Sequence, residues 1–180
     1  MPRFTQRIPT DDTRSRAVCD QCGFVDYANP KVVVGAVVTE AGQVLLCRRA
    51  IEPRRGFWTI PAGYLELDET VEEGALRETY EEAEARIMLD GILAIYSISR
   101  IGQVQVIFRA RFDGTPAFRP GVESLDTRMF AAADIPWDEL AFPSVNWALQ
   151  AWQRAGDRPL AAPAGNPPGD HRGVSPELVA

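Results

Sequence analysis

The sequence predicts an α+β protein, an α/β/α sandwich in which a mixed β-sheet lies between helices. Segments rich in β-branched residues alternate with turn residues on both sides of the middle of the chain. A single strongly patterned helix separates these strand segments, and a second helical segment follows near residue 150. Two helices and one group of strands give a layered α+β arrangement.

The first strands form a hairpin. Residues 31–40 read KVVVGAVVTE, and after the turn at Ala41-Gly42 the run QVLLCRR is the returning strand. Residues 51–56 form a loop, and FWTIPAG is a short strand that ends at Gly63. Later segments predict strands near residues 92–101, 103–112 and 127–131, and a helix over 144–154.

Changes in composition predict three parts of the chain. Residues 1–30 are polar and irregular and end at the breaker Asn29-Pro30. Residues 31–156 contain all the strongly patterned segments and form the domain. From residue 157 to 180, proline and glycine are frequent, which predicts a flexible tail.

Composition excludes several classes of function. The chain has 180 residues with 19 basic and 25 acidic side chains, a net charge of −6, which argues against a general nucleic-acid binder. The only histidine, His171, lies in the tail, so histidine triads and histidine-rich metal sites are excluded. No apolar run is long enough to span a membrane and the first residues lack a signal-peptide core, so we expect a cytoplasmic protein with reduced cysteines.

The central helix, from about Thr70 to Glu84, has an unusual acidic side. Thr70 and Glu73 have the spacing of a capping box at its start. At 100° per residue, one sector of the helix carries Glu78, Glu81 and Glu82, and we expect Leu76, Tyr80 and Ala83 to bury the other side.

Such a cluster of like charges needs a positive partner. Glutamates at i,i+4 repel each other, and the cost rises where the site is desolvated. Arg77 can pair with one carboxylate, such as Glu69, but one arginine cannot neutralise the cluster. Mg²⁺ or Mn²⁺ with oxygen ligands fits best, while the alternative is a solvated acidic helix face.

The residues before and within this helix match a known pattern. The spacing G-x5-E-x7-R-E-x2-E-E is matched by Gly63, Glu69, Arg77, Glu78, Glu81 and Glu82. This is the signature of the Nudix hydrolases, which the chain resembles over roughly residues 17–155. The segments YANPK, LLCRR, WTIPAGYLE and IPWDELAF resemble the subgroup that hydrolyses ADP-ribose and FAD.

The resemblance implies a role for each matched residue. Glu78 and Glu82 would be metal ligands, and Glu81 would share a metal or hold a ligand water. The carbonyl of Ala62 would be a backbone ligand, and Gly63 would let the backbone turn sharply. Glu69 and Arg77 would form the ion pair that orients the helix.

Further site residues come from other segments. In many relatives a glutamate from a later loop completes the site as a ligand or general base, and Glu123 in RPGVESLDTR is the candidate; the alternative is an exposed loop acid. Contacts to phosphate are expected from the arginines around the loop before the motif, Arg48, Arg49, Arg54 and Arg55, each of which has an exposed surface role as its alternative. Phe142 either stacks on adenine or belongs to the core.

One position departs from the pattern. Relatives have glycine two residues after the paired glutamates, where this chain has Glu84. A side chain in the left-handed turn that normally ends such a helix costs roughly 1 kcal/mol. Either Glu84 accepts that strain or the helix continues, and in both cases we expect Glu84→Gly to be neutral or stabilising and to leave activity intact.

The cysteines at the start resemble half of a zinc ribbon. Cys19 and Cys22 form a CxxC unit, whereas a structural zinc needs four ligands and relatives have a further CxxC upstream. Cys47 lies in a predicted strand and is badly placed to help. We therefore expect no zinc bound within one chain, although two chains could share one ion.

The resemblance implies a metal-dependent pyrophosphatase that acts on ADP-ribose or FAD and releases AMP. Hydrolysis of (d)NTPs or oxidised nucleotides is a second reading, and a nucleotide or ADP-ribose sensor is a non-enzymatic one. NADH is less favoured, because the proline- and tryptophan-rich motif of that subgroup is missing after the box. The expected partner is a small nucleotide, without nucleic acid or membrane, and relatives are often homodimers.

Overall fold

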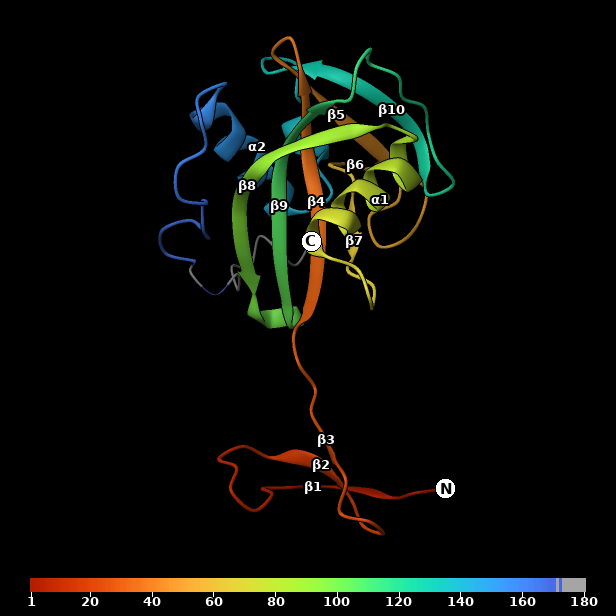
Figure 1. Ribbon diagram of the computed structural model, residues 1–180, viewed down its shortest axis with the longest axis vertical. Helices are drawn as coiled ribbons and strands as arrows, with labels where there is room; N and C mark the ends of the chain where they lie inside the picture. The colour runs from red at the N-terminus through yellow and green to blue at the C-terminus, as the bar shows by residue number, and fades with distance from the viewer. Residues whose placement is uncertain (171, 173–180) are drawn as a thin grey trace. The chain divides into compact units, whose positions relative to one another are not determined.

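The computed structural model describes residues 1–170 and 172 (Figure 1). The chain forms two compact units, Met1–Pro30 and the part that begins at Lys31, so the boundary falls where the composition changes. His171, the histidine singled out above, lies outside the described residues.

The first unit contains a small sheet where the sequence indicated only irregular structure. Three antiparallel strands, in the order β1-β2-β3, are Phe4–Arg7, Arg16–Cys19 and Val25–Asp26. The strands have two to four residues each and β1 is exposed along its whole length. Strands this short carry no alternation of buried and exposed residues, which is the signal that predicts a strand.

The second unit is built on one mixed sheet, as the sequence predicted. Its path is β10-β5-β4-β9-β8, with β6 paired to β5 and β7 paired to β4. The central pair β4 and β9 is parallel, and the other pairs are antiparallel. The strands are β4 (Lys31–Glu40), β5 (Gln43–Arg49), β6 (Trp58–Thr59), β7 (Ala62–Tyr64), β8 (Ile87–Ile98), β9 (Gln103–Phe112) and β10 (Ser124–Ala131).

Helix α1, Val71–Ala83, begins as predicted. The Thr70 hydroxyl accepts the Glu73 N–H at 3.1 Å, and the Glu73 carboxylate accepts the Thr70 N–H at 2.7 Å, which completes the capping box. The expected apolar face is wrong in detail, because Leu76 and Tyr80 are exposed. The helix instead buries small residues, among them Ala75 and Ala83, and it brings Glu78 and Glu82 inside with them.

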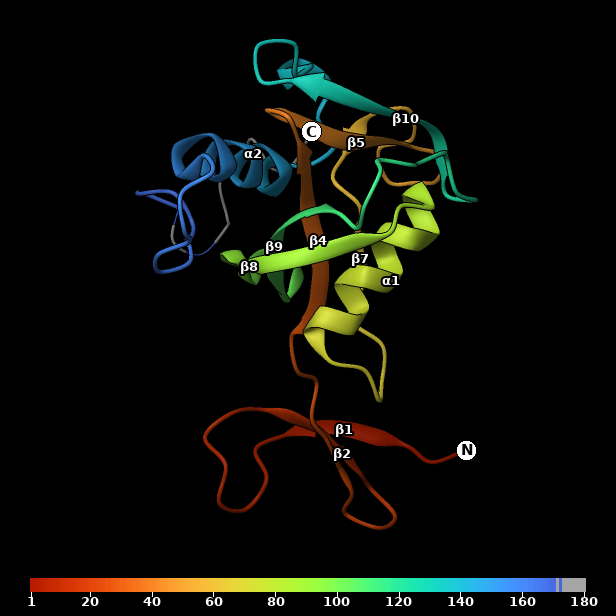
Figure 2. The same ribbon diagram turned by 45° about the horizontal axis from the view of Figure 1, so that its top comes forward.

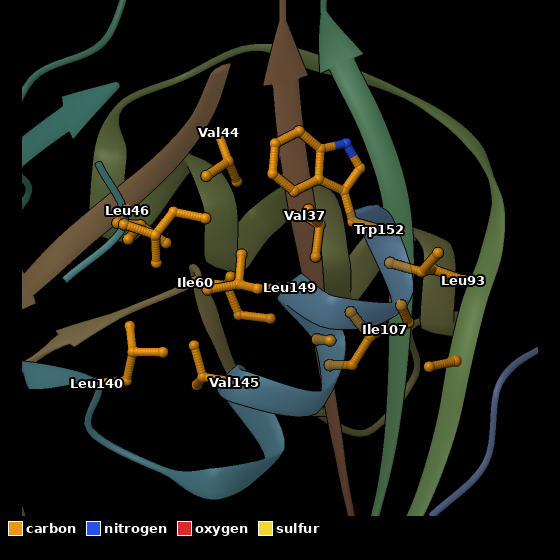
Figure 3. Packing of buried hydrophobic residues seen from close by; sticks show 14 of the residues in the cluster. Val37, Val44, Leu46, Ile60, Leu93, Ile107, Leu140, Val145, Leu149 and Trp152 are labelled. Atoms are coloured by element: carbon orange, nitrogen blue, oxygen red, sulfur yellow. The ribbon is translucent and has the colours of Figure 1, made fainter. Parts of the chain in front are cut away.

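Helix α2, Pro143–Ala155, packs on the other face of the sheet. Its buried residues Val145, Leu149 and Trp152 recur at helical spacing. Figure 3 shows them facing Val37 of β4 and Ile107 of β9. A second cluster of buried residues lies on the α1 side and includes residues from β4, β5 and β9.

The two helices therefore lie on opposite faces of the sheet, and the predicted α/β/α sandwich is confirmed (Figures 1 and 2). Two short 3₁₀ turns complete the unit, Ser99–Ile101 and Trp137–Glu139. In the part of the chain that the structure describes, neither helix has the length and apolar character needed to cross a lipid bilayer.

A flexible tail was expected over residues 157–180, of which residue 171 and residues 173–180 lie outside the described structure, and part of the described segment pairs with the sheet. Ala164 exchanges backbone hydrogen bonds with the β8 strand, donating to Leu93 at 2.9 Å and accepting from Ile95 at 2.8 Å. The Asn166 side chain exchanges two further hydrogen bonds with the backbone of Ser97, each 2.8 Å long. Edge strand β8 has unpaired backbone groups that a proline-rich segment can still satisfy, so residues 160–166 pack along it.

Candidate active site

The site lies where β7 meets α1. Gly63, within β7, pairs with Val34 of β4, and a β-carbon at Gly63 would overlap the carboxylate of Glu78. The resemblance implied a sharp turn at this glycine, but Gly63 lies in strand β7. The reason for glycine here is the close approach of the Glu78 carboxylate to the backbone.

Arg77 joins the carboxylates of the helix to each other and to β7. Its guanidinium donates to Glu69 through two nitrogens, at 2.7 and 3.0 Å, which forms the predicted ion pair. It also donates to Glu78 at 2.7 Å, to Glu81 at 3.1 Å and to the carbonyl of Tyr64 at 3.0 Å. The hydrogen bonds that Glu69 accepts from Arg77, together with the one it accepts from the N–H of Glu66, lower the pKa of Glu69 to about 2.

Glu82 is the most buried carboxylate of the site, with 6% of its surface exposed. Burial, followed by the negative charge of Glu78, raises its pKa to about 8, although the Ala62 N–H donates to it at 3.4 Å. Burial also raises the pKa of Glu78, against the hydrogen bond from Arg77. Both glutamates are therefore held in positions that disfavour a negative charge unless a cation compensates it.

Glu123 belongs to the loop before β10 and lies near this pair. Its negative charge contributes to the raised pKa of both Glu78 and Glu82, and its backbone carbonyl accepts the Ala50 N–H at 2.8 Å. The structure thus brings the loop glutamate to the helix glutamates. Its exposed carboxylate remains accessible from the pocket that the glutamates line.

That pocket has a volume of about 1050 Å³. Besides the glutamates, it is lined by Phe142 and Val145 at the start of α2, and by Tyr64 and Gln103 from β7 and β9. Gln103 donates to the Tyr64 hydroxyl at 3.2 Å, so these two side chains form one polar wall.

The arginines proposed for phosphate binding separate into two groups. Arg49 lines the pocket, and its guanidinium lies 5.1 Å from the ring centre of Phe142. Arg48 immediately precedes Arg49 in β5 and points to the other face, where it lies over Trp58 and donates to the Gly56 carbonyl at 2.8 Å. Arg54 lies over the ring of Phe57, 4.7 Å from its centre, and Arg55 is exposed. Arg49 and Phe142 are thus brought to the site, whereas Arg48 and Arg54 contact other residues.

The loop that carries Glu123 is held by two residues that no sequence pattern links, Glu84 and Arg119. Glu84 accepts the strain that its position demands, with φ 46° and ψ 26°, and α1 ends at Ala83. The carboxylate of Glu84 pairs with Arg119, which also lines the pocket. No spacing rule links residues 84 and 119, so only the fold could reveal this pair.

The donors of the site suit a hard divalent cation. Glu78, Glu81, Glu82 and Glu123 offer carboxylate oxygens, Ala62 offers a carbonyl, and two of the carboxylates are buried with raised pKa values. Arg77 holds Glu78 and Glu81, and over residues 1–170 and 172 no three acidic, histidine or cysteine side chains stand in ready ligand geometry. Arg77 engages one oxygen each of Glu78 and Glu81, which leaves their other oxygens for an ion.

The cysteine pair of the first unit forms a compact turn. Backbone N–H groups of Cys22 and Gln21 lower the pKa of the Cys19 thiol, and Cys19 and Cys22 are free thiols. Cys47 is buried in β5, where burial raises its pKa well above the usual value. A lowered thiol pKa favours metal binding, but these are only two ligands.

Comparisons with known proteins identify two family matches along this chain. The NUDIX domain family matches residues 29–152, and the Nudix N-terminal zinc ribbon family matches residues 2–28. The crystal structure of a NUDIX hydrolase from Nitrosomonas europaea is 42% identical, covers 91% of each chain and superposes with a TM-score of 0.81.

Two curated relatives are similar over shorter segments. A MutT-like protein of Streptomyces ambofaciens is 37% identical over 61% of this chain, and an ADP-ribose pyrophosphatase of Methanocaldococcus jannaschii is 34% identical over 39%. The matched segments span 65% and 42% of those two relatives. With the domain match extending over most of its length and the signature glutamates gathered in one pocket, this chain belongs to the NUDIX family.

Proposed function

We propose that this protein is a divalent-metal-dependent pyrophosphatase that hydrolyses ADP-ribose or FAD and releases AMP. The observation that carries the proposal is the group of four glutamates in one large pocket, two of them buried with raised pKa values. The relative named ADP-ribose pyrophosphatase supports the choice of substrate.

The shape of the pocket supports a substrate with groups on both sides of a diphosphate. Phe142 and Arg49 line the part near α2, and Tyr64 and Gln103 line the part formed by β7 and β9. A volume of about 1050 Å³ is at the upper end for ligand pockets and suits a nucleoside diphosphate joined to a second moiety. An aromatic ring in the first part offers a stacking surface for adenine.

The reaction is the addition of water across the diphosphate. Water attacks one phosphorus, the bridging P–O bond breaks, and ADP-ribose plus water gives AMP plus ribose 5-phosphate. A divalent cation, Mg²⁺ or Mn²⁺, supplies neutralisation of the diphosphate and activation of the attacking water when it is bound. Glu78, Glu81, Glu82, Glu123 and the Ala62 carbonyl would hold it.

The protein's own residues supply orientation and proton transfer. Arg77 and Glu69 fix the helix against β7 through the ion pair and the bond to the Tyr64 carbonyl. Glu123, which lines the pocket, would accept the proton of the attacking water or act as a ligand. Arg49 supplies positive charge for a phosphate oxygen beside Phe142.

A substrate panel with millimolar Mg²⁺ or Mn²⁺ tests the proposal. We expect AMP from ADP-ribose or FAD, and no AMP after EDTA has removed the metal. Dinucleoside polyphosphates, NADH and dNTPs complete the panel. Release of pyrophosphate from a dNTP would replace the proposed substrate with a triphosphate, and a folded protein inactive on all of them would favour the nucleotide-sensor reading.

The melting temperature of the metal-free protein should depend on whether Glu82 is ionised. Because the folded-state pKa of Glu82 is about 8, against 4.5 for the free side chain, the folded state binds more protons between these values. The melting temperature of the metal-free protein should therefore fall as pH rises from about 5 to 8, by ~5 °C. Glu69, with a pKa of about 2, affects stability only at more acidic pH.

Millimolar Mg²⁺ should reverse this fall, because the cation stabilises the ionised carboxylates of the folded state. Scanning calorimetry at several pH values, with EDTA or with Mg²⁺, provides the measurement. A melting temperature that does not change over this pH range in EDTA would contradict the assigned burial of Glu82.

A further inference from the structure

The end of α1 carries a side chain in a backbone conformation that favours glycine. Glu84 has φ 46° and ψ 26°, and its N–H donates to the Tyr80 carbonyl at 2.8 Å. Left-handed backbone of this kind is strained for residues with a β-carbon. At this position the chain keeps a glutamate, and the glutamate's carboxylate accepts a hydrogen bond from Arg119.

Arg119 begins a loop that lies directly on the last turn of α1. The Arg119 N–H donates to the Ala83 carbonyl at 2.9 Å, and the Gly121 N–H donates to the Glu82 carbonyl at 3.0 Å. Carbonyls in the last turn of a helix lack partners within the helix, so the loop satisfies them. Gly121 packs so closely that a β-carbon there would overlap the Glu81 carbonyl.

The same loop delivers Glu123 to the pocket. The Ser124 N–H donates to the Gly121 carbonyl at 3.1 Å, which closes a turn around Glu123, and the Ala50 N–H holds the Glu123 carbonyl. Glu84, Arg119 and Glu123 all line the pocket. The position of Glu123 relative to the helix glutamates thus depends on how firmly this loop is seated.

We propose that Glu84 is a positioning residue, which acts through Arg119 to hold residues 119–123 on the end of α1 and so fixes Glu123 beside Glu78 and Glu82. The proposal rests on the proposed function in taking Glu123 as part of the metal site. The glutamate keeps a strained backbone because glycine, which would relieve it, offers Arg119 no partner.

This role should leave global stability almost untouched. The Arg119 side chain is 74% exposed, and exposed ion pairs add little to the free energy of unfolding. Glu84→Gly should therefore match or exceed the wild-type melting temperature, as expected from the sequence. The expectation that Glu84→Gly leaves activity intact assumed that Glu84 has no partner. Because Glu84 pairs with Arg119, we now expect this variant to disturb the metal site.

The first test measures the loop in the metal-free protein by hydrogen–deuterium exchange. We expect Glu84→Gly, Glu84→Gln and Arg119→Ala each to speed exchange over residues 119–124 by about threefold. Glutamine keeps the β-carbon and the backbone strain but loses the charge, so it separates the ion pair from the strain. Arg111→Ala, which removes the ion pair between Arg111 of β9 and Asp90 of β8, is the control and should change nothing in the loop.

The second test measures Mn²⁺ binding through the electron paramagnetic resonance signal of the free ion. Glu84→Gly should raise the Kd for Mn²⁺ about fivefold in the wild-type background, and have no further effect when Glu123 is already Gln. A merely structural role would weaken binding equally in both backgrounds.

The outcomes separate the inference from the proposed function. Unchanged exchange in the Glu84 variants, or an Mn²⁺ effect that persists with Glu123→Gln, would overturn the positioning role. Faster exchange without any change in Mn²⁺ affinity would overturn it as well. A wild-type protein that binds no Mn²⁺ would contradict the proposed metal site. It would also contradict the inference, because Glu123 would then have no ion to bind. If Mn²⁺ binds as expected but the substrate panel is silent, only the proposed reaction fails.

Discussion

Glu82→Gln should lower kcat for the diphosphate substrate by at least about 10²-fold, the scale of losing one strong electrostatic contact in a transition state. Glutamine has nearly the same shape as glutamate but removes the negative charge that a divalent cation needs. Glu82 is the most buried carboxylate of the site, so no water can readily replace it as a ligand. Steady-state assays at saturating Mg²⁺ measure the effect.

The same variant should be as stable as the wild type, or more stable, when metal is absent. Burial and Glu78 raise the Glu82 pKa to about 8, so ionised Glu82 destabilises the metal-free fold near that pH. A rise in melting temperature together with a loss of rate would distinguish a ligand from a residue that merely supports the fold. Glu72→Gln, an exposed glutamate in the first turn of α1, is the matched control and should keep full activity.

A folded Glu82→Gln enzyme with most of its rate would show that Glu82 is not an essential ligand. The proposed metal site would then have to rest on Glu78, Glu81 and Glu123.

The strands and helices with strong local patterns could be predicted from the sequence. The hairpin β4–β5 has β-branched runs around a turn, and α1 has a capping box that the structure reproduces at Thr70 and Glu73. The small sheet of residues 1–30 could not be predicted, because its strands are too short to show alternation. The packing of residues 160–166 along β8 was also not predicted. It depends on the unpaired edge of β8, a strand about 70 residues away, and the sequence of residues 160–166 does not indicate that edge.

Within the candidate site, residues in one continuous motif were easier to predict than residues from separate segments. The Arg77–Glu69 pair was expected from the matched motif, whose two residues lie eight positions apart in one loop and helix, and the structure contains it. The partner of Glu84 lies 35 positions away, in a loop whose path is set by tertiary packing. The sequence likewise could not predict that Arg49 lines the pocket while Arg48 points away, because this depends on which face of the sheet each side chain of β5 takes.

Gly63→Ala should lower kcat by about 10²-fold or more while changing stability little. A β-carbon at this position would overlap the carboxylate group of Glu78, which is the far end of a flexible side chain. The backbone of β7 can therefore stay paired with β4, and the Glu78 carboxylate must move instead. Because Glu78 is a proposed ligand, a shift of about an ångström costs activity far more than it costs folding.

Measuring both quantities separates this reason for the glycine from the turn that the sequence suggested. If Gly63 were required for a sharp turn, alanine would strain the backbone and lower the melting temperature together with the rate. Gly165→Ala, where a β-carbon would meet no atom within 4 Å, is the control and should change neither. Weaker Mn²⁺ binding by Gly63→Ala at an unchanged melting temperature would place the effect on the Glu78 carboxylate, whereas full activity would mean that Glu78 can move without loss and is not a ligand of the reacting cation.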